Sequence, residues 1–592
     1  MKPQKRNIYH VFTRLFGNKN TTNKPWGTKA ENGVGKFNDF TDLALEEIRK
    51  LGITHIWYTG VLHHGVIGEF PEIGLTSDHP DVIKGRAGSP YAIRDYYQVN
   101  PDLAVDVTQR LEEFEALIER THRHGMKVII DIVPNHVSRY YEGRNNPAGV
   151  RDFGADDDVS VDYKKDNNFY YVTGATFQLP EPKRGYITLG GEIHLLTDKK
   201  FEEFPAKWTG NGSRLAQPDF DDWYETAKIN YGISPEGRKD FDELPSGAEF
   251  LECTSHYEFW HGKEIPNSWR KFREITQFWL EKGVDGFRYD MAEMVPVEFW
   301  SYLNSHIKMI RPDAFLMAEV YNPSLYKDYI QKGKMDYLYD KVGLYDTLKQ
   351  LIQGHGSTDL LLIVLEFSKD IERHMLHFLE NHDEVRIASP EFAINPWKAM
   401  PALVLSATVS TSPTMIYFGQ DVGEPAAEMA GFGHPNRTSI FDYIGVPQHQ
   451  KWMNGGKFDG GLLSANEKAL RNYYSEVLNF ALEAPALTGY YQELHNINRL
   501  QNPAYGDKAF AFARWDESQK LIVVCNFSEH EGLQTVLKLS PEILGIWDLA
   551  MGDRGISEVM FGKKKTMLRV TEAGAEIDLH FGPLESAVFE VR

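Results

Sequence analysis

The sequence predicts an α/β protein: a (β/α)8 TIM barrel with an inserted irregular subdomain after its third strand, followed by a C-terminal antiparallel β-sandwich. Three observations lead to this fold. Short apolar runs alternate with amphipathic helical segments through most of the chain, which is typical of parallel strands joined by helical crossovers. This alternation stops between residues 137 and 266. Beyond about residue 490, short runs of alternating apolar residues separated by turn residues replace it.

The barrel strands are expected where short apolar runs lead into polar or turn residues. These runs cover residues 8–12, 53–58, 127–131, 284–289, 315–318, 335–339, 375–379 and 414–418. Helical spacing of apolar residues predicts helices over 41–51, 107–125, 269–281 and about 466–482. Gly52 is expected to end the first of these helices, because glycine commonly follows a helix C-terminus.

The length of the chain and the places where the strand–helix alternation stops and resumes together predict the domain organisation. A chain of 592 residues exceeds what one hydrophobic core normally supports. We expect the first part of the barrel in residues 1–136, an inserted subdomain B in 137–266, the second part of the barrel in 267–489 and the β-sandwich in 490–592. An irregular segment as long as this insert is either a subdomain or a functional lid.

The charge balance, the number of cysteines and the N-terminal residues indicate which partners and which cellular compartment to expect. The chain has 84 acidic and 64 basic residues and a net charge of -20, which argues against nucleic acid or an anionic membrane as a partner and suits a neutral substrate. We also expect no insertion into a membrane. Its two cysteines, Cys253 and Cys525, lie far apart, so we expect neither a disulfide framework nor a cysteine-based metal site. No long apolar run follows the basic N-terminus. A cytoplasmic enzyme is therefore expected, with a secreted or periplasmic one as the alternative if a signal peptide was removed.

Carboxylates lie at or just beyond the ends of several predicted strands. Asp290 closes one strand, and Glu319 and Asp383 follow two others. The carboxyl ends of barrel strands meet on one face, so these groups are expected in one pocket. Arg288, two residues before Asp290, points to the same side of its strand and would keep that carboxylate ionised, as a nucleophile requires. A buried structural ion pair explains this one strand equally well, but the repetition on other strands favours an active site.

The chain resembles the α-amylase family of glycoside hydrolases, family 13. The resemblance is carried by Asp131-x-x-x-Asn135-His136, Gly286-Phe287-Arg288-x-Asp290, Glu319 and Asn381-His382-Asp383, in the family's order and spacing. Residues 52–57 and 413–421 also resemble the corresponding segments of the family, but less specifically. The resemblance covers roughly residues 7–485.

The resemblance implies a reaction and three catalytic residues. Asp290 would be the nucleophile, Glu319 the general acid/base, and Asp383 would hold sugar hydroxyls and stabilise the transition state. Hydrolysis would proceed by double displacement with retention, which places the two catalytic carboxyls about 5–5.5 Å apart. The implied substrates are α-1,4-glucosidic bonds of starch-like glucans or maltooligosaccharides.

The resemblance also assigns residues around the sugar. Tyr91 would stack on the glucosyl unit being cleaved. His136 and His382 would donate hydrogen bonds to its hydroxyls. Arg288 would contact the nucleophile, and Asp131 would orient Arg288 without touching substrate.

One departure from the family concerns the acceptor side. Many α-amylases carry a Lys-His pair after the nucleophile, whereas this sequence has Glu293 and Met294. The histidine of that pair often lends a backbone carbonyl to a structural calcium, and Met294 has the same carbonyl. Asn135 matches the side-chain ligand of that site, and its hard oxygen suits calcium. Calcium is therefore an open expectation, and no other cofactor is implied.

Three alternatives remain at the level of sequence. The same barrel could be an α-glucan transglycosidase (glucanotransferase), because water and sugar compete as acceptors. It could be an exo-acting α-glucosidase. More remotely, it could be a non-catalytic sugar-binding member of the family, although such members normally lack one of the catalytic carboxylates. The oligomeric state is open.

Overall fold

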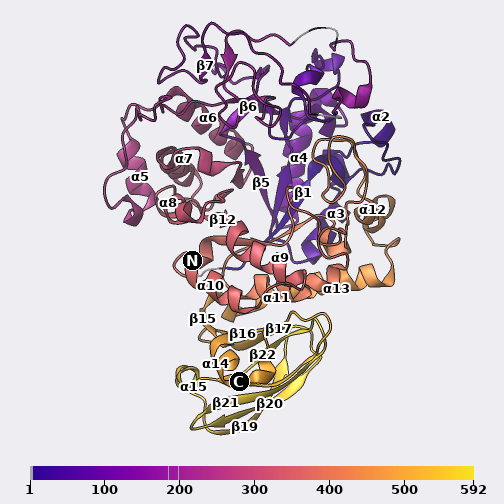
Figure 1. Cartoon of the computed structure of the whole chain (residues 1–592), viewed down its shortest axis with the longest axis vertical. Helices are drawn as coiled ribbons and strands as arrows, with labels where there is room; N and C mark the ends of the chain where they lie inside the picture. Colours follow the sequence, from indigo (N-terminus) through magenta and orange to yellow (C-terminus); the bar gives the residue numbers. More distant parts are fainter. Residues whose placement is uncertain (1–3, 184–185, 198, 200) are drawn as a thin grey trace.

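Eight parallel strands close into a barrel in the computed structural model, which describes residues 4–183, 186–197, 199 and 201–592 (Figure 1). The strands are β1 (Asn7–Phe12), β2 (His55–Thr59), β5 (Lys127–Ile132), β10 (Gly286–Tyr289), β11 (Phe315–Ala318), β12 (Tyr337–Tyr339), β13 (Met375–Phe378) and β14 (Thr414–Tyr417). Their order around the barrel is β1-β14-β13-β12-β11-β10-β5-β2. The predicted barrel is confirmed, and each predicted strand lies within two or three residues of the observed one.

Alternation along the strands divides the barrel side chains between two regions. Trp57, Ile129, Met317 and Leu376 pack inside the barrel as one buried cluster, and the intervening residues face the helices. The strand register matters for the site, because Arg288 of β10 lies directly beside Asp131 of β5. Two inward-facing charged residues are therefore adjacent at the carboxyl end of the barrel.

Helices cover the outside of the barrel. The longer ones are α3 (Asp42–Lys50), α4 (Arg110–Arg123), α6 (Asn267–Glu281), α7 (Val297–Ile310), α10 (Asp359–Phe367), α11 (Met400–Thr408) and α13 (Ala465–Glu483). Shorter ones are α1 (Thr13–Phe16), α2 (Lys29–Asn32), α8 (Tyr326–Gln331), α9 (Asp346–Ile352) and α12 (Pro447–Met453). Side-chain caps stabilise the N-termini of two helices. At α3, the Thr41 side chain accepts a hydrogen bond from the Ala44 N–H, and at α13, Ser464 forms a capping box with Glu467. All four predicted helices are present, although the second begins with a 3₁₀ turn at Val107–Gln109.

The segment between β5 and α6 contains little regular structure. β6 (His136–Ser138) pairs with β9 (Thr226–Lys228), β7 (Tyr171–Val172) pairs with β8 (Ala206–Lys207), and one helix, α5 (Cys253–Trp260), precedes α6. A separate hairpin of β3 (Leu62–His64) and β4 (Ile93–Val99) follows β2. The strands of the insert lie at the opposite end of the molecule from the C-terminal sheet (Figure 1). The exact domain boundaries stay predictions.

The C-terminal part is one antiparallel sheet of order β15-β16-β17-β22-β19-β20-β21-β18. Its elements are β15 (Tyr490–Glu493), β16 (Ala509–Trp515), β17 (Lys520–Asn526), β18 (Leu533–Leu539), β19 (Gly552–Glu558), β20 (Lys565–Thr571), β21 (Gly574–Phe581), β22 (Ser586–Glu590), α14 (His495–Gln501) and α15 (Pro541–Trp547). Apolar side chains from strands at both ends of this order, such as Ala511 and Leu537, share one core. The sheet therefore folds over itself, as a sandwich does.

The C-terminal sheet also packs against the helices of the barrel. Alternate residues of β16, including Phe510 and Phe512, belong to the core of the barrel helices rather than to the sheet's own core. Arg514 is 1% exposed and donates a hydrogen bond of 2.9 Å to the Val409 carbonyl at the end of α11. No helix in the described part of the chain is both long and apolar enough to span a bilayer.

Candidate active site

Arg288 is the centre of the site at the carboxyl end of the barrel. It is fully buried, and its guanidinium donates to Asp290 Oδ1 at 2.8 Å and to Glu319 Oε2 at 2.7 Å. A third, longer contact of 3.4 Å reaches Asp131 Oδ1. The two terminal nitrogens of one guanidinium group thus bind two carboxyls that follow neighbouring strands.

The chain bends sharply after β10 to complete this arrangement. Met291 follows Asp290 in a left-handed conformation with φ of 44°, which is uncommon for a residue with a side chain. This bend turns the Met291 N–H toward Glu319, whose Oε2 accepts it at 3.0 Å. Backbone strain of this kind persists only where surrounding contacts enforce it, and it is frequent at functional sites.

Two further groups fix the orientation of Arg288. Asp131 is 5% exposed, and its Oδ2 accepts from the Trp57 indole at 3.0 Å while its Oδ1 faces Arg288. Arg288 Nε donates to the Tyr339 hydroxyl at 3.2 Å. The geometry therefore suits the expected role of Asp131 as the residue that orients Arg288.

The ionisation of the carboxyls differs from the expectation that Arg288 keeps Asp290 ionised. Burial raises the pKa of Asp290 well above its usual range, and the Glu319 carboxylate adds to this, while the Arg288 guanidinium opposes both. Burial likewise raises the pKa of Asp131 to about 6. One cation therefore serves three buried carboxyls, and burial together with Glu319 opposes the ionisation of Asp290 more than Arg288 favours it.

Asp383 lies across from this cluster with His382 and Tyr91. The Tyr91 hydroxyl is 2.6 Å from His382 Nε2, and that nitrogen is 3.0 Å from Asp383 Oδ2. The rings of Tyr91 and His382 stack at 5.3 Å. The Asp383 side chain is 39% exposed, so it faces open space. Its exposed edge notwithstanding, the protein around the carboxyl removes part of its hydration, which together with the Glu319 carboxylate raises its pKa to about 7, against the opposing effect of Arg288.

His136 lies at the start of β6, next to the backbone of Tyr91. Burial and the nearby Lys228 lower its pKa to about 3, so the ring is neutral at physiological pH. Its ring centroid is 5.4 Å from that of Trp223 in the insert. His136 is therefore placed at the junction between barrel and insert, beside the tyrosine expected to stack on the sugar.

Asn135 does not fit a calcium ligand in this arrangement. Its side-chain oxygen accepts a hydrogen bond from the Lys228 ammonium, and its amide nitrogen donates to the Gly210 carbonyl at 2.8 Å. Burial lowers the pKa of Lys228 to about 8, and no other charge contributes to that shift. A cation already occupies the oxygen that calcium would need. Among the described residues, no group of three His, Cys, Asp or Glu side chains could hold a metal ion.

Glu293 stands where many family members have the lysine of the Lys-His pair. Its carboxylate accepts the backbone N–H groups of Tyr321 and Asn322, each at 2.9 Å. It therefore anchors the loop that follows β11. Burial and the nearby Glu319 carboxylate raise the pKa of the Tyr321 hydroxyl, so the two side chains lie close together. Sequence reasoning missed Tyr321, although its position two residues after Glu319 in an extended segment could have indicated it.

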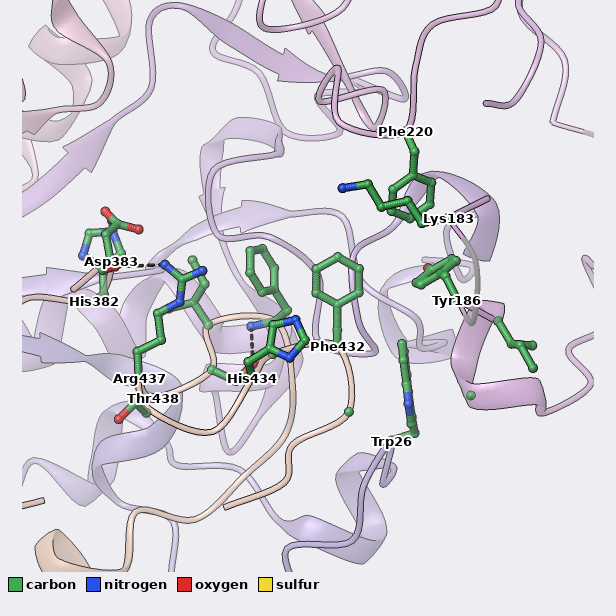
Figure 2. A pocket seen from close by; sticks show the side chains of 17 residues that line it. Trp26, Lys183, Tyr186, Phe220, His382, Asp383, Phe432, His434, Arg437 and Thr438 are labelled. Atoms are coloured by element: carbon green, nitrogen blue, oxygen red, sulfur yellow. Dashed lines mark hydrogen bonds and ion pairs between the residues drawn. The ribbon is translucent and has the colours of Figure 1, made fainter. Parts of the chain in front are cut away.

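A cavity of about 730 Å³ opens beside Asp383 (Figure 2). Its lining includes Trp26, Tyr186, Phe220 and Phe432, which come from three loops far apart in the sequence. Phe220 belongs to residues 217–220, which weakly resemble a family motif, whereas Trp26, Tyr186 and Phe432 lie in no family motif and at no strand end. Their joint location depends on how the loops fold.

The comparisons with known proteins agree with this architecture. A model of the alpha-amylase catalytic domain matches residues 10–186 and 259–441. Alpha-amylase 3 of Dictyoglomus thermophilum is 22% identical over 544 residues, covering 88% of this chain and 85% of that protein. Neopullulanase 2 of Thermoactinomyces vulgaris is 22% identical over 551 residues, covering 90% of this chain and 71% of that protein.

A solved structure shares the fold over the whole length. The crystal structure of a noncanonic maltogenic alpha-amylase, AmyB, from Thermotoga neapolitana has a TM-score of 0.60 at 17% identity, covering 100% of this chain and 99% of that one. The family match spans more than half of the chain and includes the strands that carry Arg288, Asp290 and Glu319. This protein therefore belongs to the alpha-amylase family of glycoside hydrolases and transglycosidases.

Proposed function

We propose that the protein is a retaining glycoside hydrolase that cleaves α-1,4-glucosidic bonds in starch-like glucans or maltooligosaccharides. The observation that carries this proposal is the pairing of Asp290 and Glu319 on the two arms of Arg288. Retaining glycosidases require two carboxyls close together, one as nucleophile and one as acid. The shared arginine brings both carboxyls together in one small buried cluster.

The reaction would proceed in two displacements. Glu319 donates its proton to the glycosidic oxygen while Asp290 attacks the anomeric carbon, so the leaving chain departs with a free hydroxyl and a glycosyl ester forms on Asp290. Glu319, now a carboxylate, takes a proton from water, and the resulting hydroxide displaces Asp290 from the anomeric carbon. The product keeps its anomeric configuration. Asp383 accepts hydrogen bonds from sugar hydroxyls throughout.

Further features support a neutral sugar as substrate. The net charge of -20 disfavours an anionic ligand, and the cavity beside Asp383 presents aromatic rings. The two relatives are named as an alpha-amylase and a neopullulanase, which suits an α-glucan. Glu293 bonds its own loop, so it offers no evident contact to an acceptor sugar. This leaves water as the favoured acceptor.

The test is a product profile with its stereochemistry. Purified protein would be incubated with soluble starch and separately with maltotriose, and sugars would be resolved over time while NMR follows the first anomer released. The proposal expects shorter α-anomeric products that appear with wild-type protein and not with Glu319→Gln. Products longer than maltotriose would instead show transfer. Unchanged turnover by Glu319→Gln, or a β-anomeric product, would overturn the assignment.

A further inference from the structure

Helix α10 is apolar on almost every face. Apart from Asp359 and Glu366, all of its residues are leucine, isoleucine, valine or phenylalanine. A helix that is hydrophobic all round is normally buried in a core. Within this helix, however, only Leu361 is buried. Three other apolar side chains are exposed: Leu360 at 38%, Ile363 at 65% and Phe367 at 64%. The helix thus has the sequence of a core helix but lies at the surface.

The exposed residues of α10 lie on one face. Leu360, Ile363 and Phe367 are spaced by three and four positions, so they form one stripe along the helix, the α10 stripe. A second side of the helix is already packed, because Leu361 belongs to the barrel core and Val364 packs against it. Single exposed apolar residues are ordinary on a protein surface, whereas a contiguous apolar surface marks an interaction site. The α10 stripe therefore indicates a contact surface for another molecule.

The helix that carries the α10 stripe is fixed at its start. The Thr358 N–H donates to the Asp507 carbonyl at 3.0 Å, and Asp359 Oδ1 accepts from Arg499 Nε at 2.7 Å. His495 Nε2 lies 2.8 Å from the same carboxylate oxygen. Figure 1 shows α10 between the barrel and the C-terminal sheet, and these contacts tie it to the C-terminal part. An anchored helix loses little conformational freedom when its exposed face binds a partner.

The charges around the α10 stripe are balanced. An ion pair flanks each end of the stripe: Arg499–Asp359 at 2.7 Å at the amino end and Lys327–Asp370 at 2.8 Å at the carboxyl end. Glu366, within the helix, is also paired with a lysine, at 3.1 Å. An anionic membrane attracts surfaces with an excess of basic residues, which these pairs do not provide. A second copy of the chain, which carries the same net charge of -20, meets no excess of negative charge in these pairs.

The α10 stripe suits a twofold arrangement. Ile363 lies at its middle, with Leu360 three positions before it and Phe367 four positions after it. About a twofold axis perpendicular to the helix near Ile363, two copies of α10 run antiparallel, and Leu360 of each copy meets Phe367 of the other. The ion pair at the amino end of each stripe then lies beside the pair at the carboxyl end of the other. The four charged side chains of these pairs are 31–71% exposed, so each cation can face an anion of the other copy.

We propose that the α10 stripe is the centre of a contact between two copies of this chain, related by a twofold axis that passes near Ile363. Twofold dimers are the commonest assemblies of soluble chains, and homodimer interfaces are more apolar than other protein interfaces. Three side chains cover less than the ~800 Å² per partner of a standard interface, so the dimer is expected to dissociate in the micromolar range. The dimer does not depend on the reaction at the carboxyl cluster.

Sedimentation velocity of the whole chain tests the dimer. Between about 1 and 100 µM, the mass of the wild type is expected to rise from 67.8 kDa toward twice that value. Ile363→Glu places a charge opposite its own copy at the axis, so the dissociation constant should rise about tenfold or more. Leu43→Glu is the matched control and should leave the dissociation constant unchanged, because this 45% exposed leucine belongs to α3, which lies apart from α10 in Figure 1.

Oxidative crosslinking tests the position of the axis. A residue near a twofold axis lies close to its own copy. Ile363→Cys, in a Cys253→Ser background, is therefore expected to give a disulfide-linked dimer, because cysteines with Cα atoms within about 7 Å of each other can be bridged. Leu43→Cys in the same background should stay monomeric in denaturing electrophoresis, and Cys525 is buried and needs no replacement. A dimer that forms in solution while Ile363→Cys gives no crosslink would overturn the proposed axis.

Two results of the sedimentation experiment would overturn the dimer itself: a wild type that keeps a mass of 67.8 kDa throughout, or a dimer that Ile363→Glu does not weaken. A monomer that instead binds phosphatidylcholine vesicles, with binding lost in Ile363→Glu, would also overturn it and assign the α10 stripe to a lipid surface. Melting temperatures identify a misfolded variant, and Phe367→Glu replaces Ile363→Glu in that case. Starch cleavage by Ile363→Glu is expected to equal that of the wild type, so the dimer and the proposed reaction are tested separately.

Discussion

The carboxyl cluster and the aromatic lining of the cavity beside Asp383 are built in different ways. The carboxyl cluster of Asp131, Arg288, Asp290 and Glu319 lies at the carboxyl ends of barrel strands and is buried and interlocked by hydrogen bonds. The aromatic wall of Trp26, Tyr186, Phe220 and Phe432 lies on loops and is half-exposed. The difference predicts that changes in the cluster abolish turnover, whereas changes in the half-exposed wall leave the carboxyl cluster in place.

The largest expected effect follows from removing Asp290, the proposed nucleophile. Asp290→Asn should lower kcat on maltooligosaccharides by roughly 10⁴-fold or more, because the covalent step is lost. Binding of maltoheptaose, measured by calorimetry, should stay close to that of the wild type. A variant with most of its turnover intact would show that the carboxyl cluster is structural, and the contrast with the aromatic wall would disappear.

Arg288→Lys should be the next most damaging change. An ammonium cannot bridge Asp290 and Glu319 as the guanidinium fork does. We expect kcat/KM to fall about 10²–10³-fold, and the free energy of unfolding to fall by about 3–5 kcal/mol because buried carboxyls lose their partner. Denaturant unfolding and steady-state kinetics measure the two effects. A loss of activity without any loss of stability would mean that Arg288 serves the reaction alone.

A smaller effect, on the pH dependence of kcat/KM, is expected at Asp383. If Asp383 must be ionised to accept sugar hydroxyls, kcat/KM falls as pH drops through its pKa of about 7. The Arg437 cation lowers this pKa, so Arg437→Gln should raise it and move the acid limb to higher pH. The shift should stay below about one unit, because Arg437 is exposed and salt screens it.

The pH profile at low and high salt checks this prediction. With 1 M NaCl the profiles of wild type and Arg437→Gln should converge, because screening at that concentration acts within about 3 Å. Lys369→Gln, which removes an exposed cation from a site distant in the sequence, is a suitable control. An acid limb that moves to lower pH in Arg437→Gln would contradict the electrostatic explanation.

No effect at all is expected from removing calcium. Because the Lys228 ammonium already holds the Asn135 oxygen, EDTA or added CaCl₂ should leave the melting temperature of the wild type unchanged. Thermal denaturation after exhaustive dialysis, with calcium measured by mass spectrometry, checks this. Stoichiometric calcium, or a fall in melting temperature with EDTA, would show that the insert is held to the barrel by a metal ion after all.

The strand-borne half of the site could be predicted from sequence for a physical reason. Residues at the ends of parallel strands have positions set by the sheet, so the amino-acid pattern alone indicates that Asp290 and Glu319 lie together. Trp26, Tyr186 and Phe432 could not be placed in this way, because loops from three regions converge only through tertiary packing. The Lys228–Asn135 contact joins residues 93 positions apart for the same reason. The ionisation of Asp290 also required burial to be known, because burial outweighs the adjacent arginine.

Both faces of strand β16 are buried, which limits how the chain could be truncated or its C-terminal sheet exchanged. Ala511 faces the sheet's own core, while Phe510 and Phe512 belong to the core of the barrel helices. A chain cut after α13 would leave an apolar surface of the barrel uncovered and prone to aggregate. The C-terminal sheet is thus no detachable module. Gene fusions or exchanges with other family members should carry the barrel and the sheet together.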